Sequence, residues 1–449
     1  MFIKSILENG AKPGIQELQT QCIQKTIDEV FLAGGGEVTI PKGRYRIGGL
    51  RLRSHVTLHL LEDAVLEASR DPEDYFILDN DTVEPFPKEL IVHEGLYGKR
   101  NEPLVHLYGH RWHNAIIRAC FAKDIAIIGE AGSIIDGMNC YDEGGEEQYR
   151  GPHGISIIKC DHIVLRGFTI QNSGNWPESI WWSSDLLCEY LTNLAGHDGV
   201  HFTSCEDVII RKCSFYTGDD CIAGFDNQNV LVEDCEINTA CSAFRFGGTN
   251  VLVHHCHIFA PARYTFRGVL TKEEKKLGIN KEGNENKRYN MLSIFTYYAD
   301  FSTTIRCVPG NIVIRDCLIE GADRFLYFNY SGASIWQQNR PLGNITFENL
   351  DVRDLSMPLT AYGDSDQPCD VTLKRVNISL RQGFEDLVFI NAANFNRITL
   401  QDVRFSNSTS QVLAKIWPGN GNQEICTENV TGIGLDCEHP KEKFDSKPI

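Results

Sequence analysis

The chain has 449 residues, of which 42% are hydrophobic and 23% charged, so it can build a large core and is not a disordered chain. Its net charge of −17 excludes a general nucleic-acid binder, because such proteins need a basic face to replace phosphate counterions. The first ten residues are too polar for the core of a signal peptide, and no apolar run is long enough to span a membrane. We therefore expect a cytoplasmic protein, or a secreted one if a signal peptide has been removed, that binds neither nucleic acid nor membranes.

The first predicted element is a helix over residues 15–31, where apolar side chains recur at close to helical spacing. A run of three glycines, Gly34–Gly36, ends it. Short stretches of alternating apolar and polar residues then indicate strands near residues 37–40, 45–47 and 56–60.

From about residue 115 onwards, one short pattern recurs: Asn or Asp followed by alternating apolar residues. It is clearest at Asp207, Asn229 and Asn250, at intervals of 22 and 21 residues. Repeats of this length are typical of solenoids. The strands favour Val and Ile, no helical pattern separates them, and the spacing of leucine-rich repeats is missing. The pattern therefore predicts an all-β protein, a right-handed parallel β-helix with a short N-terminal capping helix.

No linker rich in Pro, Gly or Ser divides the chain, so we expect residues 1–449 to form a single domain. Two excursions interrupt the repeats, at about residues 80–114 and 262–309. Long excursions in a regular solenoid are often functional. Four of the 16 cysteines follow the same strand pattern (Cys213, Cys235, Cys256 and Cys317), which favours reduced, buried thiols over disulfides.

Three aspartates are the candidate catalytic residues. Asp198 and Asp219 lie 21 residues apart, one repeat, and Asp220 follows directly. Stacked coils would bring such carboxylates together, and their mutual repulsion would raise the pKa of at least one. A protonated acid beside ionised bases is the arrangement that glycosidic hydrolysis needs. Two other readings stay open: aspartates that only form turns, and a calcium site.

Several motifs resemble glycoside hydrolase family 28, the polygalacturonase and rhamnogalacturonase group. The resemblance covers most of the chain, and the segments that carry it are residues 35–45, 60–75, 132–137, 172–181, Gly196–Asp198 and Asp219–Ala223. It implies an inverting hydrolase without metal or other cofactor. Asp219 would be the general acid, and Asp198 with Asp220 would position and deprotonate water.

The chain departs from the family's pattern at two motifs that bind substrate. The family's histidine is missing near Ser242, and its Arg-x-Lys motif, which binds a uronate carboxylate, has no clear match. Arg245 and Arg267 are possible replacements, because a guanidinium can form two parallel bonds with a carboxylate. The predicted substrate-binding residues are His197, His201, Ser242, Arg245, Arg267 and Trp176. No ligand spacing supports a zinc site at the histidines.

We therefore expect an inverting, exo-acting glycoside hydrolase. Its partner would be an oligosaccharide substrate, a pectic chain (polygalacturonan or rhamnogalacturonan) that contains galacturonic acid. The alternatives are a β-helical polysaccharide lyase and a non-catalytic carbohydrate-binding solenoid. The sequence leaves a homo-oligomer open.

Overall fold

The computed structural model describes residues 2–75, 114–282, 287–299, 306, 308–331 and 340–442. The excursion expected at residues 80–114 lies outside the described residues, except for Asn114. The chain forms two compact units, and each is described by itself. The first comprises Met1–Asp219 and Arg263–Arg288, and the second comprises Asp220–Ala262 and Tyr289–Ile449. The single-domain organisation stays a prediction.

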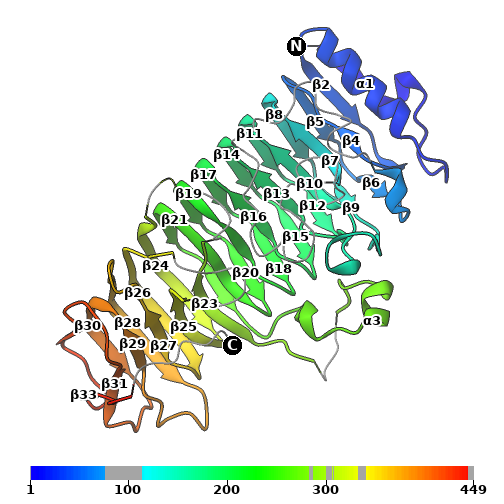
Figure 1. Ribbon diagram of the computed structural model, residues 1–449. Helices are drawn as coiled ribbons and strands as arrows, with labels where there is room; N and C mark the ends of the chain where they lie inside the picture. Colours follow the sequence, from blue (N-terminus) through cyan, green and yellow to red (C-terminus); the bar gives the residue numbers. More distant parts are fainter. Residues whose placement is uncertain are drawn as a thin grey trace. The chain divides into compact units, whose positions relative to one another are not determined.

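The first unit is built almost entirely of short strands (Figure 1). Its strands are β1 (Phe2–Ser5), β2 (Gly36–Ile40), β3 (Gly43–Ile47), β4 (Leu50–Arg51), β5 (Val56–Leu60), β6 (Ala64–Ala68), β7 (Ala115–Cys120), β8 (Lys123–Gly129), β9 (Ile134–Asp136), β10 (His153–Ile158), β11 (Asp161–Arg166), β12 (Thr169–Gln171), β13 (Glu178–Trp181), β14 (Ser184–Glu189), β15 (Thr192–Ala195), β16 (Val200–Thr203), β17 (Glu206–Arg211) and β18 (Ser214–Thr217). Its helices are α1 (Thr20–Leu32), α3 (Lys272–Leu277) and the 3-10 turns η1 (Ile6–Asn9), η2 (Pro72–Asp74), η7 (Glu146–Gln148) and η8 (Arg267–Val269).

The second unit repeats the same plan with longer strands that bend around a corner. Its strands are β19 (Ile222–Glu233), β20 (Glu236–Thr239), β21 (Ser242–His254), β22 (His257–Phe259), β23 (Met291–Tyr297), β24 (Gly310–Glu320), β25 (Ala322–Asn329), β26 (Asn344–Leu355), β27 (Leu359–Tyr362), β28 (Cys369–Leu380), β29 (Ile390–Ala393), β30 (Phe395–Phe405), β31 (Val412–Ile416), β32 (Glu424–Glu428) and β33 (Asp436–Glu438).

Strands one coil apart pair in parallel and in register. In the first unit three ladders run side by side: β7–β10–β13–β16, β8–β11–β14–β17 and β9–β12–β15–β18. In the second unit β21, β24, β26, β28 and β30 form one ladder and β21, β23, β25, β27 and β29 another. Ladders of this kind, joined by corners, are the parallel β-helix that the repeats predict.

The recurring Asn or Asp marks a corner of the coil. Asp124 and Asp207 in the first unit, and Asn229 and Asn250 in the second, have φ between 52° and 57°. Asn and Asp tolerate this left-handed conformation better than other side chains. In the second unit the Asn250 amide also donates to Asn229 Oδ1 at 3.1 Å, so the corner residues bond from coil to coil. The recurring Asn or Asp of the sequence therefore marks the position of a backbone turn.

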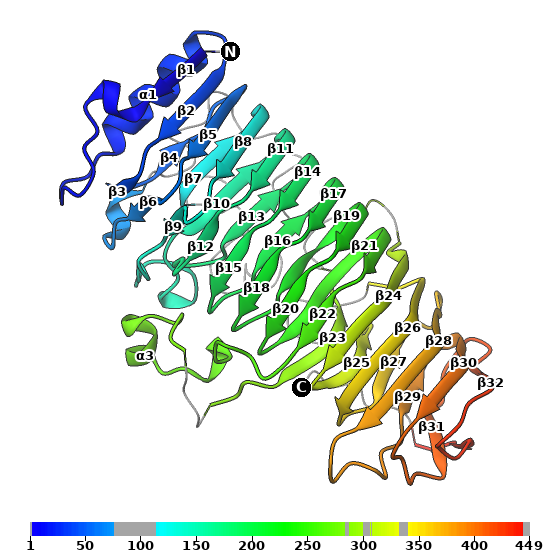
Figure 2. The same cartoon turned by 180° about the vertical axis from the view of Figure 1, so that it is seen from behind.

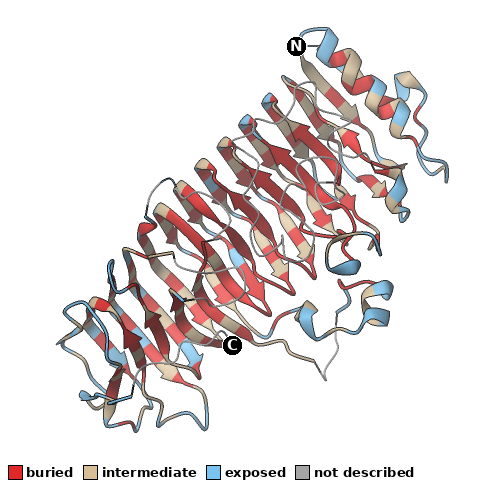
Figure 3. Ribbon diagram, viewed as in Figure 1, coloured by how far each residue is buried: buried red, intermediate tan, exposed pale blue. Residues whose placement is uncertain are grey.

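The core of each unit is the inside of the coil. Val208 and Ile210 on β17 are fully buried, whereas Ile209 between them is 37% exposed, as alternation on a strand requires. Figure 3 shows the same contrast between buried strands and exposed corners. The predicted reduced state holds for the described cysteines, all of which are free.

Helix α1 covers one end of the first unit, beside β1 and β2 (Figures 1 and 2). Its buried face consists of Ile23, Thr26, Ile27 and Val30. It begins at Thr20, five residues later than expected. The Gln19 backbone N–H donates to Arg46 O on β3, so it does not donate to residue 15, as a helix that began there would require. No helix among the described residues is long and apolar enough to cross a membrane.

One ionisable group lies inside the first unit's coil. Glu178 on β13 is fully buried, and the Asn193 amide donates to its Oε2 at 2.6 Å. Burial raises the pKa of Glu178 from 4.5 to about 8, and the bond from Asn193 opposes this only in part. The folded protein therefore holds this carboxyl protonated at neutral pH, whereas the unfolded chain releases the proton.

Replacing Glu178 by Gln should remove a pH dependence of stability. Because the folded-state pKa is raised, the stability that this carboxyl supports is complete below pH 4.5 and falls until about pH 8. The difference between the pKa values of the unfolded and the folded state corresponds to a change of at most about 5 kcal/mol in the free energy of unfolding, at 1.36 kcal/mol per pKa unit. Urea unfolding between pH 5 and pH 8.5 should show this slope in the parent chain and a flatter one in Glu178→Gln. Equal slopes would contradict a buried, neutral Glu178.

Candidate active site

Asp198 and Asp219 lie one coil apart in the first unit. Asp198 follows β15 and Asp219 follows β18. The two strands pair with each other, and Ala195 lies opposite Thr217. The Asp219 N–H points to His197 O at 3.4 Å, and the two aspartates are only 4% and 5% exposed. The coil register therefore brings these two predicted catalytic residues to neighbouring levels of the stack, about 4.8 Å apart along its axis.

Arg267, which begins η8, binds Asp219 directly. Its Nε donates to Asp219 Oδ2, and its terminal nitrogen donates to Glu147 Oε2 at 2.6 Å and to Tyr149 Oη at 3.1 Å. Burial disfavours the charged guanidinium, but Asp219, Tyr149 and Glu147 raise the pKa of Arg267 well above its ordinary value. The guanidinium is thus a fixed positive charge beside the candidate acid.

A second arginine completes this network. Arg150 donates to Glu147 Oε1 at 3.0 Å and to Asn175 Oδ1 at 2.9 Å. Burial would raise the pKa of Glu147, but Arg150 and Arg267 lower it to about 2. Glu147 is therefore ionised and holds both guanidinium groups.

The ion pair sets a condition on catalysis by Asp219. An opposite charge within bonding distance favours the ionised carboxylate, whereas a general acid must carry a proton. In the arrangement observed here Asp219 is an acceptor. To donate a proton it has to lose Arg267, which a second anion could draw away.

His201 and Trp176 form a packed pair next to Asp198. His201 Nδ1 lies 3.1 Å from Asp198 Oδ2, and the imidazole stacks on the indole of Trp176 at 3.8 Å with 5° between the planes. His153 lies against the same indole at 5.3 Å. His201 is therefore held beside the carboxylate by stacking. The contact of Trp176 and His201 with substrate stays a prediction.

His197 is nearly inaccessible, with 1% of its surface exposed. Burial, and then the charges of Arg150 and Arg267, lower the pKa of His197 well below its ordinary value. The ring lies 6.0 Å from that of Tyr149, nearly parallel to it. His197 is thus a neutral imidazole at neutral pH, and its predicted role in binding substrate stays a prediction.

The other predicted residues belong to the second unit. Asp220 Oδ1 accepts the backbone N–H of Ser242 at 3.0 Å, and the Arg245 Nε lies 3.6 Å from Oδ2. The Arg245 guanidinium also covers the ring of Tyr298 at 3.9 Å. The Ser242 hydroxyl contacts Thr296 Oγ1 at 3.0 Å. Arg245 and Ser242 therefore orient Asp220, as Arg267 and His201 orient the other two aspartates.

The boundary between the units falls between Asp219 and Asp220, which are consecutive residues. The cluster of three carboxylates that the sequence suggests thus stays a prediction. So does the division of their roles between acid and base.

Part of the excursion after residue 262 packs on the first unit. The Gly196 N–H donates to Asn280 Oδ1 at 2.5 Å. A Cβ atom at Gly196 would collide with the carbonyl of Ile279, and one at Gly218 with that of Thr265. Glycine is needed at both positions because the backbone of the excursion lies directly on them. Arg267 of the same excursion also contacts Asp219 directly.

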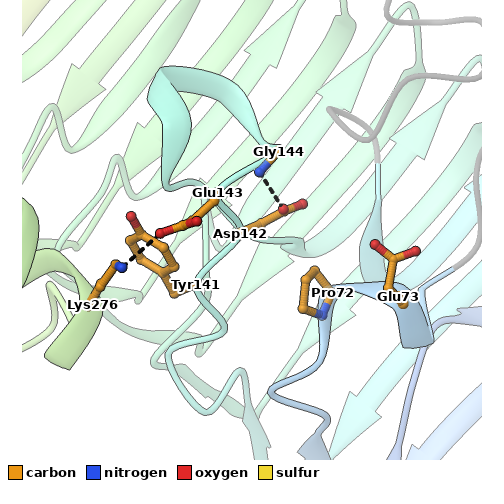
Figure 4. Close-up of a pocket in the computed structure, with 7 residues that line it drawn as sticks. All are labelled: Pro72, Glu73, Tyr141, Asp142, Glu143, Gly144 and Lys276. Carbon is orange, nitrogen blue, oxygen red and sulfur yellow. Dashed lines mark hydrogen bonds and ion pairs between the residues drawn. The ribbon is translucent and has the colours of Figure 1, made fainter.

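Helix α3 is attached beside an open pocket. Lys276 contacts Glu143 at 2.7 Å, and the pocket next to this pair measures about 590 Å³ (Figure 4). It is lined by Pro72, Glu73, Tyr141, Asp142, Glu143, Gly144 and Lys276. Its three carboxylates would repel an acidic sugar, so this pocket does not suit a uronate.

Glu147, Tyr149 and Arg150 are site residues that sequence reasoning missed. They lie in the loop that contains η7, outside the repeating strands. No spacing relates them to Arg267, which is 117 to 120 residues away in the chain. Only the folding of the excursion brings them together.

Comparisons with known proteins agree with this architecture. The family model of the right-handed beta helix region matches residues 104–277. A probable polygalacturonase of Vitis vinifera is 27% identical over 241 residues, which are 50% of this chain and 45% of the relative. The chain thus spans about half the length of the curated relative that it matches.

Solved structures with the same fold include two exopolygalacturonases and an adhesin. The exopolygalacturonase of Thermotoga maritima has a TM-score of 0.62 at 16% identity, over 91% of this chain and 92% of that one. The family 28 exopolygalacturonase of Yersinia enterocolitica has 0.54 at 16%, over 100% and 79%. The adhesin PfbA of Streptococcus pneumoniae has 0.53 at 14%, over 97% and 98%.

These likenesses confirm two expectations from the sequence. The fold is a right-handed parallel β-helix, and the chain resembles the polygalacturonase group. Because an adhesin shares the fold, the fold alone does not decide whether the chain is an enzyme.

Replacing Gly196 by Ala should loosen the excursion. The added methyl group would meet the Ile279 carbonyl, and overpacking of this kind costs about 1–3 kcal/mol. Hydrogen exchange in residues 263–282 should become faster. The control is Gly343→Ala, where the nearest atom is 3.3 Å away and no effect on this segment is expected. Unchanged exchange in Gly196→Ala would show that the excursion does not rest on this glycine.

Proposed function

We propose that the chain is an inverting glycoside hydrolase. It would act from the end of pectic oligosaccharides (polygalacturonan or rhamnogalacturonan) that contain galacturonic acid. The observation that carries this proposal is the pair of buried aspartates, Asp198 and Asp219, at neighbouring levels of the coil, with Asp220 next in the chain. The sequence relative, a probable polygalacturonase, supports the substrate class.

In the proposed reaction Asp219 gives its proton to the oxygen of the glycosidic bond as that bond breaks. A water molecule attacks the anomeric carbon from the opposite face and loses a proton to Asp198 or Asp220. Inverting enzymes place such carboxyl groups about 6.5–9.5 Å apart, which leaves room for the water. His201 and Arg245 would keep the two bases oriented, since each contacts one of them.

Arg267 links the proposed chemistry to an acidic substrate. A uronate carboxylate would compete with Asp219 for the guanidinium, since both are anions that can accept its N–H groups. Transfer of Arg267 to the sugar would free Asp219 to hold a proton. A neutral sugar offers no such exchange, which supports galacturonic acid over neutral hexoses.

The packing of the excursion supports action at chain ends. Residues 263–282 lie over the loops that carry Asp198 and Asp219, and a covered site does not accept the middle of a long polymer as readily as its end. An oligosaccharide remains the proposed partner. A cytoplasmic location is also a proposal, supported by the free cysteines, and fractionation of cells with an antibody tests it.

The alternative of a non-catalytic carbohydrate-binding solenoid is favoured by one observation. Asp219 forms an ion pair with Arg267, which a general acid would have to leave before it gives up a proton. Product analysis over a panel of pectic oligosaccharides distinguishes the hydrolase, the lyase and the non-catalytic solenoid. New reducing ends indicate hydrolysis, an unsaturated product that absorbs in the ultraviolet indicates a lyase, and binding without products indicates the solenoid.

Replacing Asp219 by Asn should reduce kcat by a factor of about 10² or more, because a positioned general acid contributes 10²–10⁴. Glu143→Gln is the control, since it removes a carboxylate that pairs with Lys276 and not with Arg267, and should change kcat by less than tenfold. Initial rates of reducing-end release measure both. Near-normal turnover in Asp219→Asn would overturn the assignment of the acid.

Exhaustive treatment with a chelator should leave hydrolysis unchanged. Asp219 accepts from the Arg267 guanidinium, so this carboxylate already has a positive partner. Rates before and after treatment, with and without added calcium, provide the measurement. A loss that calcium restores would instead support the calcium-dependent lyase.

A further inference from the structure

One face of the second unit carries cations and aromatic rings from four successive coils. Tyr327 on β25, Thr360 on β27, Asn391 on β29 and Lys415 on β31 occupy the same register position. Arg324, Tyr362 and Trp417 belong to the same four strands or follow them directly. All of these except Thr360 are partly exposed. We call Arg324, Tyr327, Tyr362, Asn391, Lys415 and Trp417 the distal row.

Arg324 is a largely buried cation without an ion pair among the described residues. Its guanidinium covers the ring of Tyr327 at 4.6 Å, and one terminal nitrogen donates to the Met357 sulfur at 2.9 Å, a weak acceptor. Burial lowers the pKa of Arg324. A charge desolvated in this way gains most from an anionic partner.

The carboxylate nearest in sequence is already occupied. Asp323 accepts hydrogen bonds from Asn290, Ser356 and Arg381, and Arg381 forms the ion pair at 2.7 Å. Other arginines of the second unit, such as Arg353 and Arg397, lie within 3.1 Å of a carboxylate. Arg324, by contrast, is largely buried and forms no ion pair with a described residue, in a chain with a net charge of −17.

The β31 end of the distal row also combines a cation with an aromatic ring. Lys415 lies over the ring of Trp417 at 4.7 Å and forms no ion pair with a described residue. The Trp417 indole N–H donates to Asn391 Oδ1 at 2.7 Å. Burial raises the pKa of Tyr362, which also bonds to Asn391, so its phenol stays protonated and can donate. Two unpaired cations thus flank a set of rings and hydrogen-bonding groups.

We propose that the distal row binds the acidic sugars of a pectic oligosaccharide. Arg324 and Lys415 would take uronate carboxylates, and the rings of Tyr327, Tyr362 and Trp417 would pack on sugar faces. The distance from β25 to β31 is three coil steps, about 14 Å, which is longer than one sugar ring. A ligand that reaches from Arg324 to Lys415 therefore has to contain several sugars. The row therefore distinguishes longer chains from dimers.

The row continues the ladder of the candidate site within the second unit. Ser242, Ser293 and Arg324 are opposite one another on β21, β23 and β25, and Ser242 bonds to Asp220. Only the naming of the ligand as an acidic glycan rests on the proposed function. Binding by the row does not require that the aspartates catalyse.

The test compares chain lengths. In the full chain carrying Asp219→Asn, calorimetry measures the affinity for octagalacturonate and for digalacturonate. Arg324→Gln and Lys415→Gln should each weaken octamer binding about 10-fold to 100-fold, since a charge-assisted hydrogen bond contributes about 1.5–3 kcal/mol. Digalacturonate binding should change less than twofold. Arg397→Gln, which removes one positive charge that is paired with Glu424, should leave both affinities unchanged.

The outcomes separate the row from the proposed reaction. Equal octamer affinity with and without the two substitutions would overturn the proposal that the distal row binds acidic sugars, whether or not the chain hydrolyses pectic substrates. A second outcome is that the unsubstituted chain cleaves no pectic substrate while the Arg324 and Lys415 substitutions still weaken octamer binding. That result would contradict the proposed reaction and support binding by the distal row. If Arg324→Gln does not fold, Lys415→Gln and Trp417→Ala, at partly exposed positions, replace it, and unchanged octamer affinity in both overturns the row.

Discussion

The constraint on which the rest of this structure depends is the register of parallel strands from coil to coil. Backbone hydrogen bonds fix which residue lies over which, so side chains one coil apart become neighbours, 22 residues apart between β15 and β18 and 21 or 22 between β19 and β21. The left-handed corners at Asp and Asn keep this register, since each restarts a strand at the same level. Asp198 and Asp219 owe their proximity to this geometry and not to any local motif.

Charge balance is the second organising feature. Burying carboxylates in a chain with a net charge of −17 is costly unless each finds a positive or donating partner. Asp219 has Arg267, Glu147 has Arg150 and Arg267, and Asp220 has the Ser242 N–H and Arg245. Such pairing stabilises the fold. In the proposed reaction the Asp219–Arg267 pair also has to separate before Asp219 can act as an acid.

The cations fall into two groups. Arg150 and Arg267 bind carboxylates of the chain itself, whereas Arg324 and Lys415 face aromatic rings. A cation on a ring keeps part of its attraction for an anion, because the ring does not neutralise its charge. This difference separates residues that hold the structure together from residues that remain available to a ligand.

The sequence alone determined the features that repeat. The period of Asn229 and Asn250 and the alternation of Val and Ile predicted the parallel β-helix, since a corner and a buried strand each require a particular residue type at a fixed interval. The same interval related Asp198 to Asp219. Only the tertiary structure decided the partners of these aspartates. Arg267 meets Glu147 and Tyr149 through a non-repeating excursion, and no periodicity records where such a segment packs. Likewise, the spacing of Arg324 and Lys415 indicated nothing, because whether a cation lacks a carboxylate depends on every side chain that folding brings near it.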